Sequence, residues 1–161
     1  MRYFLGNGGV SGLGLYLMSL KELLFSFQGR IGRKTYWLWN LCYYLGILGF
    51  VTAVSKLFPA YSYILLPIFL LALLIPDLAV TTKRWHDRNK SAYWLVLNIP
   101  LILGRLATPL SAPLAQEPSG METLIGSIAL LCGAWILLEC GFLKGTEGCN
   151  RYGEPERQLR D

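Results

Sequence analysis

The chain has 161 residues, of which 53% are hydrophobic and 16% are charged, and its formal net charge is +5. Soluble domains typically carry about 25% charged residues, so this composition excludes an ordinary soluble domain and predicts an integral membrane protein. The positive charge does not by itself indicate nucleic-acid binding, because lysine and arginine collect in the cytoplasmic loops of membrane proteins.

Two segments precede the first long apolar run. Met1–Gly14 is rich in glycine, and we expect it to be loose. Leu15–Phe27 is amphipathic at helical spacing, since Ser19, Glu22 and Ser26 form a narrow polar stripe. A helix of this kind can lie in the membrane interface with its apolar face toward the lipid. The sequence therefore predicts an N-terminal amphipathic interfacial helix.

Four apolar runs follow, each compatible with a bilayer-spanning helix, which needs about 20 mostly apolar residues. The third run is interrupted by Asn98, Pro100 and Arg105. The predicted spans are residues 36–57, 63–82, 93–110 and 124–143. Together they predict an all-α fold, a four-helix transmembrane bundle.

The basic residues predict the orientation of this bundle. All but two of the 15 basic residues, Lys56 and Arg105, lie before the first span, between the second and third, or after the fourth. The positive-inside rule then places both ends of the chain in the cytoplasm, N-in and C-in. The predicted organisation is a cytoplasmic segment 1–29, a membrane domain 30–146 and a cytoplasmic tail 147–161.

Three polar motifs fall on this predicted cytoplasmic side. They are Phe27-Gln28-Gly29-Arg30-Ile31-Gly32-Arg33 leading into Tyr36-Trp37, then Arg84-Trp85-His86-Asp87-Arg88, then Lys144-Gly145-Thr146-Glu147-Gly148-Cys149-Asn150-Arg151-Tyr152-Gly153. In this order they resemble the domain-of-unknown-function 805 family of small bacterial inner-membrane proteins. The family pattern is F-x-G-R-x-x-R-x-x-Y/F-W, then R-L-H-D, then G-T-x-G-x-N-x-Y-G.

The resemblance covers roughly Phe25–Pro155, with a few departures from the pattern. Trp85 replaces the usual leucine, Asn89-Lys90 stand in a turn that usually carries glycine, and Met1–Leu17 is longer than typical. None of these removes a polar residue of the motifs. The resemblance implies a multi-pass protein of the bacterial inner membrane. It implies no activity, because the family is named for lacking one.

The motif residues form a candidate polar or lipid site: Arg30, Arg33, Arg84, His86, Asp87, Arg88, Asn150, Arg151 and Tyr152. In a structural interpretation, His86 caps a helix end, and Asp87 neutralises an arginine of another motif: Arg30, Arg33 or Arg151. In a functional interpretation, bidentate arginines bind an anionic head group. Acid–base catalysis by His86 and Asp87 is a third interpretation, although adjacent residues rarely point the same way.

A second candidate site is an intramembrane polar layer formed by Asn40, Asp77 and Glu139. Each lies roughly 7–9 Å inside the cytoplasmic end of its helix at 1.5 Å per residue. Charged residues within spans are costly and usually face the bundle interior. The layer is either a proton or cation site or a set of acids paired with basic residues above them: Arg33, Arg84 or Lys144.

The four cysteines, Cys42, Cys132, Cys140 and Cys149, form no CxxC pair and indicate neither a disulfide framework nor a zinc site. We expect them to be small packing residues, and we predict no metal and no cofactor.

The predicted function is a non-enzymatic inner-membrane module that binds lipid head groups or a membrane partner through a cytoplasmic arginine-rich face. One alternative is a small ion-coupled transporter that uses Asp77 and Glu139. Another is an enzyme that acts on lipid phosphates with His86 as base. The predicted partners are membrane lipids, anionic lipids among them, and a membrane-protein partner or a second copy of the chain, but not nucleic acid.

Overall fold

The computed structural model describes residues 19–107 and 119–156, and these residues form helices and connecting segments with no strand. The α-helices are α1 (Leu20–Phe25), α2 (Arg33–Leu57), α3 (Ser62–Asp87), α4 (Asn98–Ala107) and α5 (Gly120–Ile136). Short 3-10 segments, Pro59–Tyr61 and Ala92–Leu97, precede α3 and α4, and a π-helical turn, Leu137–Phe142, continues α5. The all-α prediction is confirmed, whereas Met1–Gly14 lies outside the described residues.

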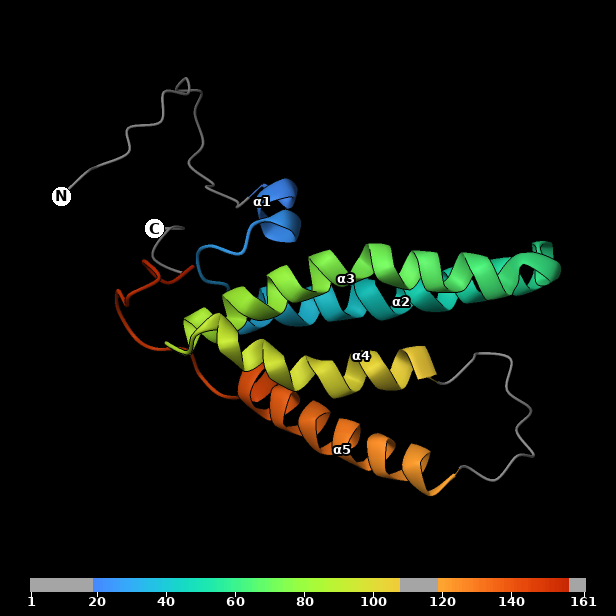
Figure 1. Cartoon of the computed structure of the whole chain (residues 1–161). Coiled ribbons are helices and arrows are strands. Elements are labelled where there is room, and N and C mark those ends of the chain that lie inside the picture. Colours follow the sequence, from blue (N-terminus) through green and yellow to red (C-terminus); the bar gives the residue numbers. More distant parts are fainter. Residues whose placement is uncertain (1–18, 108–118, 157–161) are drawn as a thin grey trace, which may run out of the picture.

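The long helices form two pairs. Helix α2 packs along α3 through most of its length, and α4 packs along α5 (Figure 1). The pairs meet at the end where α2 begins and α3 ends, and they diverge toward the opposite end (Figure 1). Helix α1 lies against α3 near the end where the pairs meet.

Among the described residues, three helical stretches are long and apolar enough to cross a membrane: Arg33–Leu57, Pro59–Asp87 and Gly120–Phe142. They contain the first, second and fourth predicted spans, apart from Leu143. The stretch Ala92–Gly104 is also apolar but shorter.

The third predicted span therefore differs from the other three. Its first part, Ala92–Leu97, is a 3-10 segment, and the α-helix begins only at Asn98. Pro100 lies in the first turn of α4, where backbone N–H groups have no partner within the helix, so its missing N–H is tolerated there. Residues 108–110 of the predicted span lie outside the described residues.

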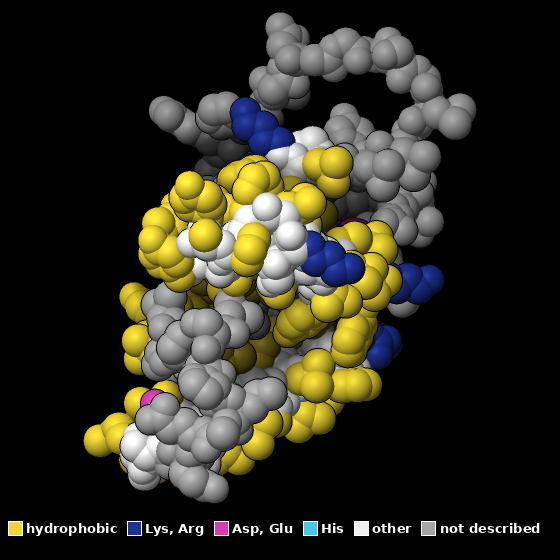
Figure 2. All heavy atoms as spheres, turned by 90° about the vertical axis from the view of Figure 1, so that its right-hand side faces the viewer, with side chains coloured by type: hydrophobic (Ala, Val, Ile, Leu, Met, Phe, Trp, Pro, Cys, Tyr) yellow, Lys and Arg dark blue, Asp and Glu magenta, His cyan; other side chains and the backbone are white. Residues whose placement is uncertain are grey.

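The outer surfaces of these helices are apolar and suit contact with lipid rather than with water. Large hydrophobic side chains such as Leu48, Ile68 and Leu130 are exposed along them. Viewed from the end where the two pairs diverge, hydrophobic side chains cover much of the surface (Figure 2). Contiguous apolar surface of this kind marks a membrane or protein contact.

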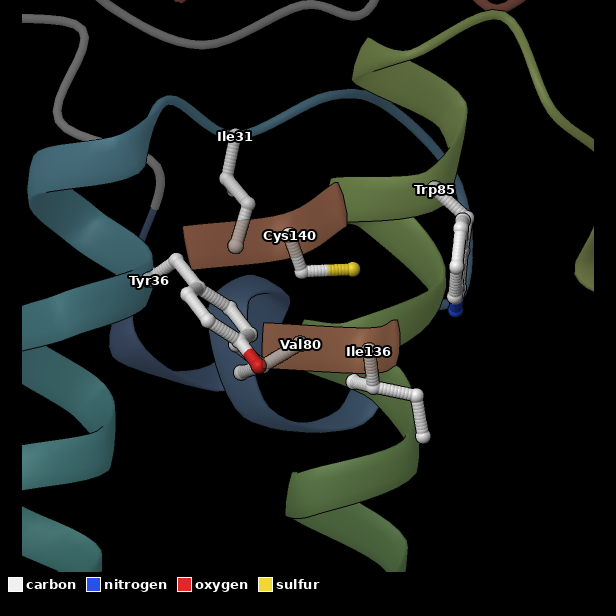
Figure 3. Close-up of a cluster of buried hydrophobic side chains, with 6 residues drawn as sticks. All are labelled: Ile31, Tyr36, Val80, Trp85, Ile136 and Cys140. Atoms are coloured by element: carbon white, nitrogen blue, oxygen red, sulfur yellow. The ribbon is translucent and has the colours of Figure 1, made fainter. Parts of the chain in front are cut away.

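The buried core sits at the opposite end, where the helix pairs meet. Its members come from the segment before α2 and from α2, α3, α5 and the π-helical turn (Figure 3): Ile31, Tyr36, Val80, Trp85, Ile136 and Cys140. Cys140 is fully buried, in agreement with its predicted role as a small packing residue, whereas Cys42 and Cys149 are exposed and do not fit that prediction. The core therefore holds the polar motifs in place at this end.

Within the described part of the predicted interfacial helix, residues 19–27, the helix is α1, six residues long, and residues 15–18 lie outside the described residues. Ser19 and Glu22 form a capping box at the start of α1. The Ser19 side chain accepts from the backbone N–H of Glu22, and the Glu22 side chain accepts from the backbone N–H of Ser19. Leu23 and Leu24 pack against the core, whereas Leu20 is 76% exposed. Part of the apolar surface that the sequence assigned to lipid is therefore covered by the bundle.

Candidate functional site

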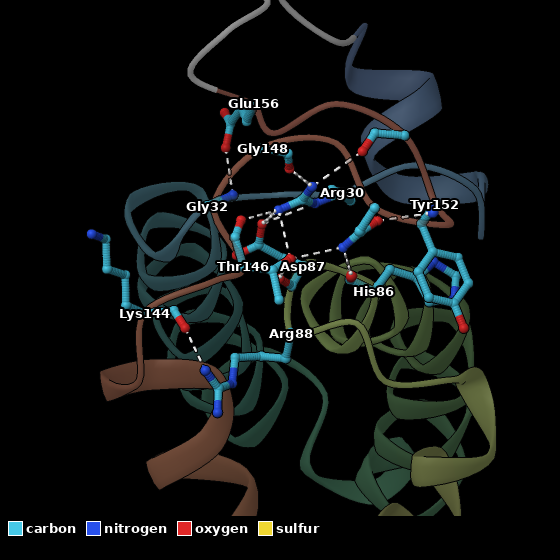
Figure 4. A network of polar contacts seen from close by, with 12 residues as sticks. Arg30, Gly32, His86, Asp87, Arg88, Lys144, Thr146, Gly148, Tyr152 and Glu156 are labelled. Carbon is cyan, nitrogen blue, oxygen red and sulfur yellow. Dashed lines mark hydrogen bonds and ion pairs between the residues drawn. The ribbon is translucent and has the colours of Figure 1, made fainter.

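The three polar motifs meet at one end of the bundle and surround Asp87 (Figure 4). The Asp87 Oδ1 atom accepts from Arg30 Nη2 at 3.0 Å and from Arg30 Nε at 3.2 Å. Its Oδ2 atom accepts from Arg84 Nη1. The side chains of both arginines are 0% exposed and that of Asp87 is 8% exposed. We call Arg30, Arg84, Asp87, Thr146 and Asn150 the polar cluster. The predicted pairing of Asp87 with an arginine of another motif is confirmed for Arg30.

Arg30 connects the first motif to the third. Its Nη1 atom donates to the carbonyls of Gly148 at 2.8 Å and Gly153 at 3.1 Å, and its Nη2 atom to the carbonyl of Thr146 at 2.7 Å. Gly148 and Gly153 adopt φ angles of 69° and 115°, which residues with side chains rarely adopt. The glycines of the third motif thus let the chain turn so that its carbonyls reach one guanidinium.

Arg84 satisfies the end of the helix that α5 and the π-helical turn form. Its Nε atom donates to the Cys140 carbonyl and its Nη2 atom to the Leu143 carbonyl, both at 2.6 Å. The last carbonyls of a helix have no partner within it, and a cation is favourable there. Arg84 therefore joins α3 to the end of the fourth predicted span.

The third motif also covers the end of α3. Thr146 donates from its backbone N–H to the Asp87 carbonyl at 2.8 Å, and Asn150 Nδ2 donates to the His86 carbonyl at 3.0 Å. A Cβ atom at Gly145 would lie 1.9 Å from Asp87 Oδ2. Any side chain here would collide with the Asp87 carboxylate, so only glycine fits at position 145.

His86 does not cap a helix end, so that part of the structural interpretation is wrong. Its Nδ1 atom lies 3.2 Å from the carbonyl of Gly29, and its ring stacks on Tyr152 with centroids 3.7 Å apart. The ring points sideways from α3 because the loop before α2 and the third motif both pack there. His86 and Asp87 have different partners and do not form a joint acid–base pair.

The other motif arginines lie around the polar cluster. Arg33 Nη1 donates to the Phe142 carbonyl at 3.0 Å, and Arg151 Nη2 to the Asn89 carbonyl at 3.0 Å. Both side chains belong to exposed residues. Arg33 and Arg151, predicted as alternative partners of Asp87, make neither of its ion pairs, because Arg30 and Arg84 occupy both carboxylate oxygens.

The predicted intramembrane polar layer is divided between two places. Glu139 pairs with Arg88 at 3.2 Å and with Lys90 at 2.7 Å. Asp77 Oδ1 accepts from Trp39 Nε1 at 3.4 Å, and Asn40 Nδ2 donates to the Tyr36 carbonyl at 2.9 Å. The predicted pairing of Glu139 with Arg33, Arg84 or Lys144 is wrong, because the turn after α3 brings Arg88 and Lys90 closer to it.

Lys90 lies among three tryptophans that the sequence analysis did not group. Its Nζ atom is 4.3 Å from the ring centroid of Trp94, 5.4 Å from that of Trp85 and 6.0 Å from that of Trp135. A cation over an indole face is stabilised by the ring quadrupole. The ammonium of Lys90 therefore joins the turn after α3 to the 3-10 segment before α4, to α5 and, through Glu139, to the π-helical turn.

Two further residues with structural roles were missed. Lys83 Nζ donates to the carbonyls of Glu22, Leu23 and Ser26, at 2.8, 2.6 and 2.5 Å. Glu156 Oε2 accepts from the Gly32 backbone N–H at 2.6 Å and so caps the start of α2. A carboxylate is favourable at a helix start, but a separation of 124 residues gave no sequence signal for this pair.

A groove of about 970 Å³ lies between the α2–α3 pair and the α4–α5 pair. Asn40 and Asp77 line it, whereas Glu139 does not. Its lining is mostly apolar, with leucines such as Leu45, Leu74 and Leu101. In the described parts of the chain, no group of three or more His, Cys, Asp or Glu residues could hold a metal ion.

Comparison with known proteins gives one family and several relatives. A family profile described as "Protein of unknown function (DUF805)" matches residues 24–154. The uncharacterized protein YiiR of Escherichia coli (strain K12) is 31% identical over 144 residues, which cover 89% of this chain and 94% of that protein. The inner membrane protein YhaI of the same strain is 29% identical over 144 residues, covering 88% and 94%. No solved structure matches this chain.

Proposed function

We propose that this chain, which belongs to the DUF805 family of proteins of unknown function, is a non-enzymatic inner-membrane module that binds anionic lipid head groups. A relative is named an inner membrane protein, and three helices in the described part of this chain are long and apolar enough to cross a membrane. The binding surface in this proposal is the basic rim, formed by the exposed residues Arg33, Lys34 and Arg151.

The division of the arginines into two groups is the observation that carries this proposal. Arg30 and Arg84 are buried, and their guanidinium groups are surrounded by Asp87 and backbone carbonyls. The structure gives the guanidinium groups of Arg33 and Arg151 one hydrogen bond each among the described residues. A guanidinium has five N–H donors in a fork that matches phosphate. Arg33 and Arg151 therefore keep donors for a ligand.

The expected orientation places the basic rim at the depth of the lipid head groups. If both chain ends are cytoplasmic, the rim lies at the head groups of the cytoplasmic leaflet, where each basic residue gains about 1 kcal/mol from anionic lipid. Lys144 is left out of the rim because it pairs with Glu147, a hydrogen bond that lowers the pKa of the Glu147 carboxyl.

The two alternative functions, a lipid-phosphate enzyme and an ion-coupled transporter, receive less support from the geometry. An enzyme that uses His86 as base would need its ring free, but His86 is only 7% exposed, and its ring is stacked on Tyr152 and hydrogen-bonded to the Gly29 carbonyl. A transporter that uses Asp77 and Glu139 would need both acids on one path. Glu139 instead forms ion pairs away from the groove that Asp77 lines.

Native mass spectrometry of the full chain with retained lipids tests the proposal. Neutralising the rim in the double variant Arg33→Gln, Arg151→Gln should weaken retention of phosphatidylglycerol by roughly 2 kcal/mol, or about thirtyfold. The matched double lysine variant should recover only part of this, because lysine cannot bind phosphate bidentately.

Lys56→Gln is the control, since it removes an exposed charge at the opposite end of α2. If the double glutamine variant retains as much phosphatidylglycerol as this control, the rim is not a lipid site. A retained protein or a second copy, recognised by its mass, would identify a protein partner instead.

A further inference from the structure

We propose that the groove between the two helix pairs binds a neutral lipid, with its apolar chain along the groove and its hydroxyl or ester head near Asn98. This site is separate from the basic rim and takes a different class of lipid. It therefore goes beyond the proposed function and does not depend on it.

The size and walls of the groove suit an apolar chain. Its volume of about 970 Å³ lies at the upper end of the range of roughly 300–1,000 Å³ that ligand pockets occupy. Helices α2 and α3 form one wall and α4 and α5 the other. Three of these four helices belong to the stretches that can cross a membrane, so the groove is at a depth where lipid chains are available.

Uncharged amide and hydroxyl side chains lie toward one end of the groove, whereas the carboxylate of Glu122, bound in the capping box that starts α5, lies toward the other. Asn40 lies near the start of α2, Thr81 near the end of α3 and Asn98 at the start of α4, all toward the end where the helix pairs meet. The middle of the groove is lined by side chains such as Leu45 and Leu101. An occupant that matches this arrangement has a polar head and an apolar chain.

Asn98 is the observation that points to a hydrogen-bonding head. The residue lines the groove and is only 8% exposed, yet its amide nitrogen has no hydrogen-bond partner. Buried polar groups of native proteins almost always have partners, and an unpaired donor destabilises the structure. This nitrogen is also shielded from solvent, so the Asn98 amide has to turn toward the groove before a hydroxyl or carbonyl oxygen of a ligand head can supply the acceptor that is missing in the described part of the chain.

The charges around the groove favour an uncharged head over a phosphate. The described residues that line the groove include the carboxylates of Asp77 and Glu122 but no lysine or arginine. A phosphate buried in the groove would therefore have no lysine or arginine of the described chain beside it, and an uncompensated buried charge is strongly unfavourable. The amides and hydroxyls of Asn40, Thr81 and Asn98 suit an alcohol or an ester instead.

Gly126 allows the groove to be filled without disturbing the helices. It lines the groove, and a Cβ atom built on it meets no heavy atom within 4 Å. Gly126→Leu therefore places a side chain in the space proposed for the lipid. Gly46→Leu is a matched control, because Gly46 is equally free of contacts but does not line the groove.

The experiment measures equilibrium binding of tritiated monoolein to the full chain in detergent. The parent and Gly46→Leu should bind it saturably, and Gly126→Leu at least tenfold more weakly. Asn98→Leu should weaken binding by about tenfold, the effect of losing one hydrogen bond. Oleoyl lysophosphatidic acid, which has an anionic head, should compete poorly for the site.

Three results would overturn the proposal. The first is non-saturable monoolein binding to the parent, and the second is equal affinity for the parent and Gly126→Leu. The third is a dimeric parent and a monomeric Gly126→Leu by native mass spectrometry, which would mean that a second copy fills the groove.

Discussion

At the scale of single residues, the polar cluster depends on one carboxylate placed between two buried arginines. Asp87 accepts from Arg30 and Arg84, and the remaining donors of those arginines reach backbone carbonyls. A buried charge is tolerable only when it is paired and its other hydrogen-bonding groups are satisfied. Each charge here meets that condition, so the cluster holds the ends of three membrane segments together.

Removal of the Asp87 carboxylate should therefore destabilise the whole fold. We expect Asp87→Ala to lower the free energy of unfolding by about 3–5 kcal/mol, because two buried guanidinium groups lose their counter-charge. Asp87→Asn, which keeps the size but not the charge, should recover only a part of this. Thermal unfolding in detergent measures both variants.

The control is Glu147→Ala, which removes a carboxylate from an exposed ion pair with Lys144. Exposed pairs of this kind contribute roughly 0–1 kcal/mol. An Asp87→Ala protein as stable as the Glu147→Ala protein would show that the polar cluster does not hold the helix ends together.

At the scale of elements, α1 depends on a side chain of α3. Six residues are too few for a helix that is stable by itself in water. The capping box starts α1, and the Lys83 ammonium satisfies three carbonyls at its end. We therefore infer that α1 is stable only because Lys83 of α3 donates hydrogen bonds to the carbonyls at its end.

Lys83→Met should release α1 while leaving the membrane helices folded. Methionine keeps much of the apolar stem of lysine but offers no donor to the Glu22, Leu23 and Ser26 carbonyls. Hydrogen exchange of the backbone amides of residues 20–26 should become faster, whereas exchange in α2 and α3 should not change. Lys21→Met is the control, since it removes an exposed charge from α1 itself. Unchanged protection of residues 20–26 in Lys83→Met would rule out this dependence.

At the scale of the whole molecule, the two ends of the bundle differ in chemistry. The motif end carries the core, the polar cluster and the basic rim, and the helix pairs diverge from it. Under the positive-inside rule the motif end faces the cytoplasm. This orientation is a prediction that labelling can test.

Single cysteines in a background without the four native cysteines should report the two sides separately. Lys34→Cys and Lys144→Cys should react with a membrane-impermeant thiol reagent only when it reaches the cytoplasmic side. Lys56→Cys and Met121→Cys should react only from the opposite side. All four positions are exposed, so accessibility within the fold does not distinguish them. Labelling of Lys34→Cys and Lys56→Cys from one side would contradict a spanning α2.

Local properties of the sequence were enough to predict the fold class, the family and three of the helical spans. Membrane insertion depends on the length and composition of each apolar run, and both can be read from consecutive residues. The third run was harder, because it is divided at Asn98 into a 3-10 segment and α4, and its composition alone did not indicate this division.

The roles of the charged residues were decided only by the tertiary structure. The sequence placed Arg30, Arg84 and Asp87 at one end of the molecule, but it could not distinguish these buried partners from the exposed Arg33 and Arg151. Long side chains can reach many acceptors, and the choice depends on how segments 57 to 124 residues apart pack together. The pairing of Glu139 with Lys90, the cap that Glu156 places on α2 and the groove between the helix pairs arise in the same way. Each is a relation between separate helices, whereas hydrophobicity and charge are properties of the chain itself.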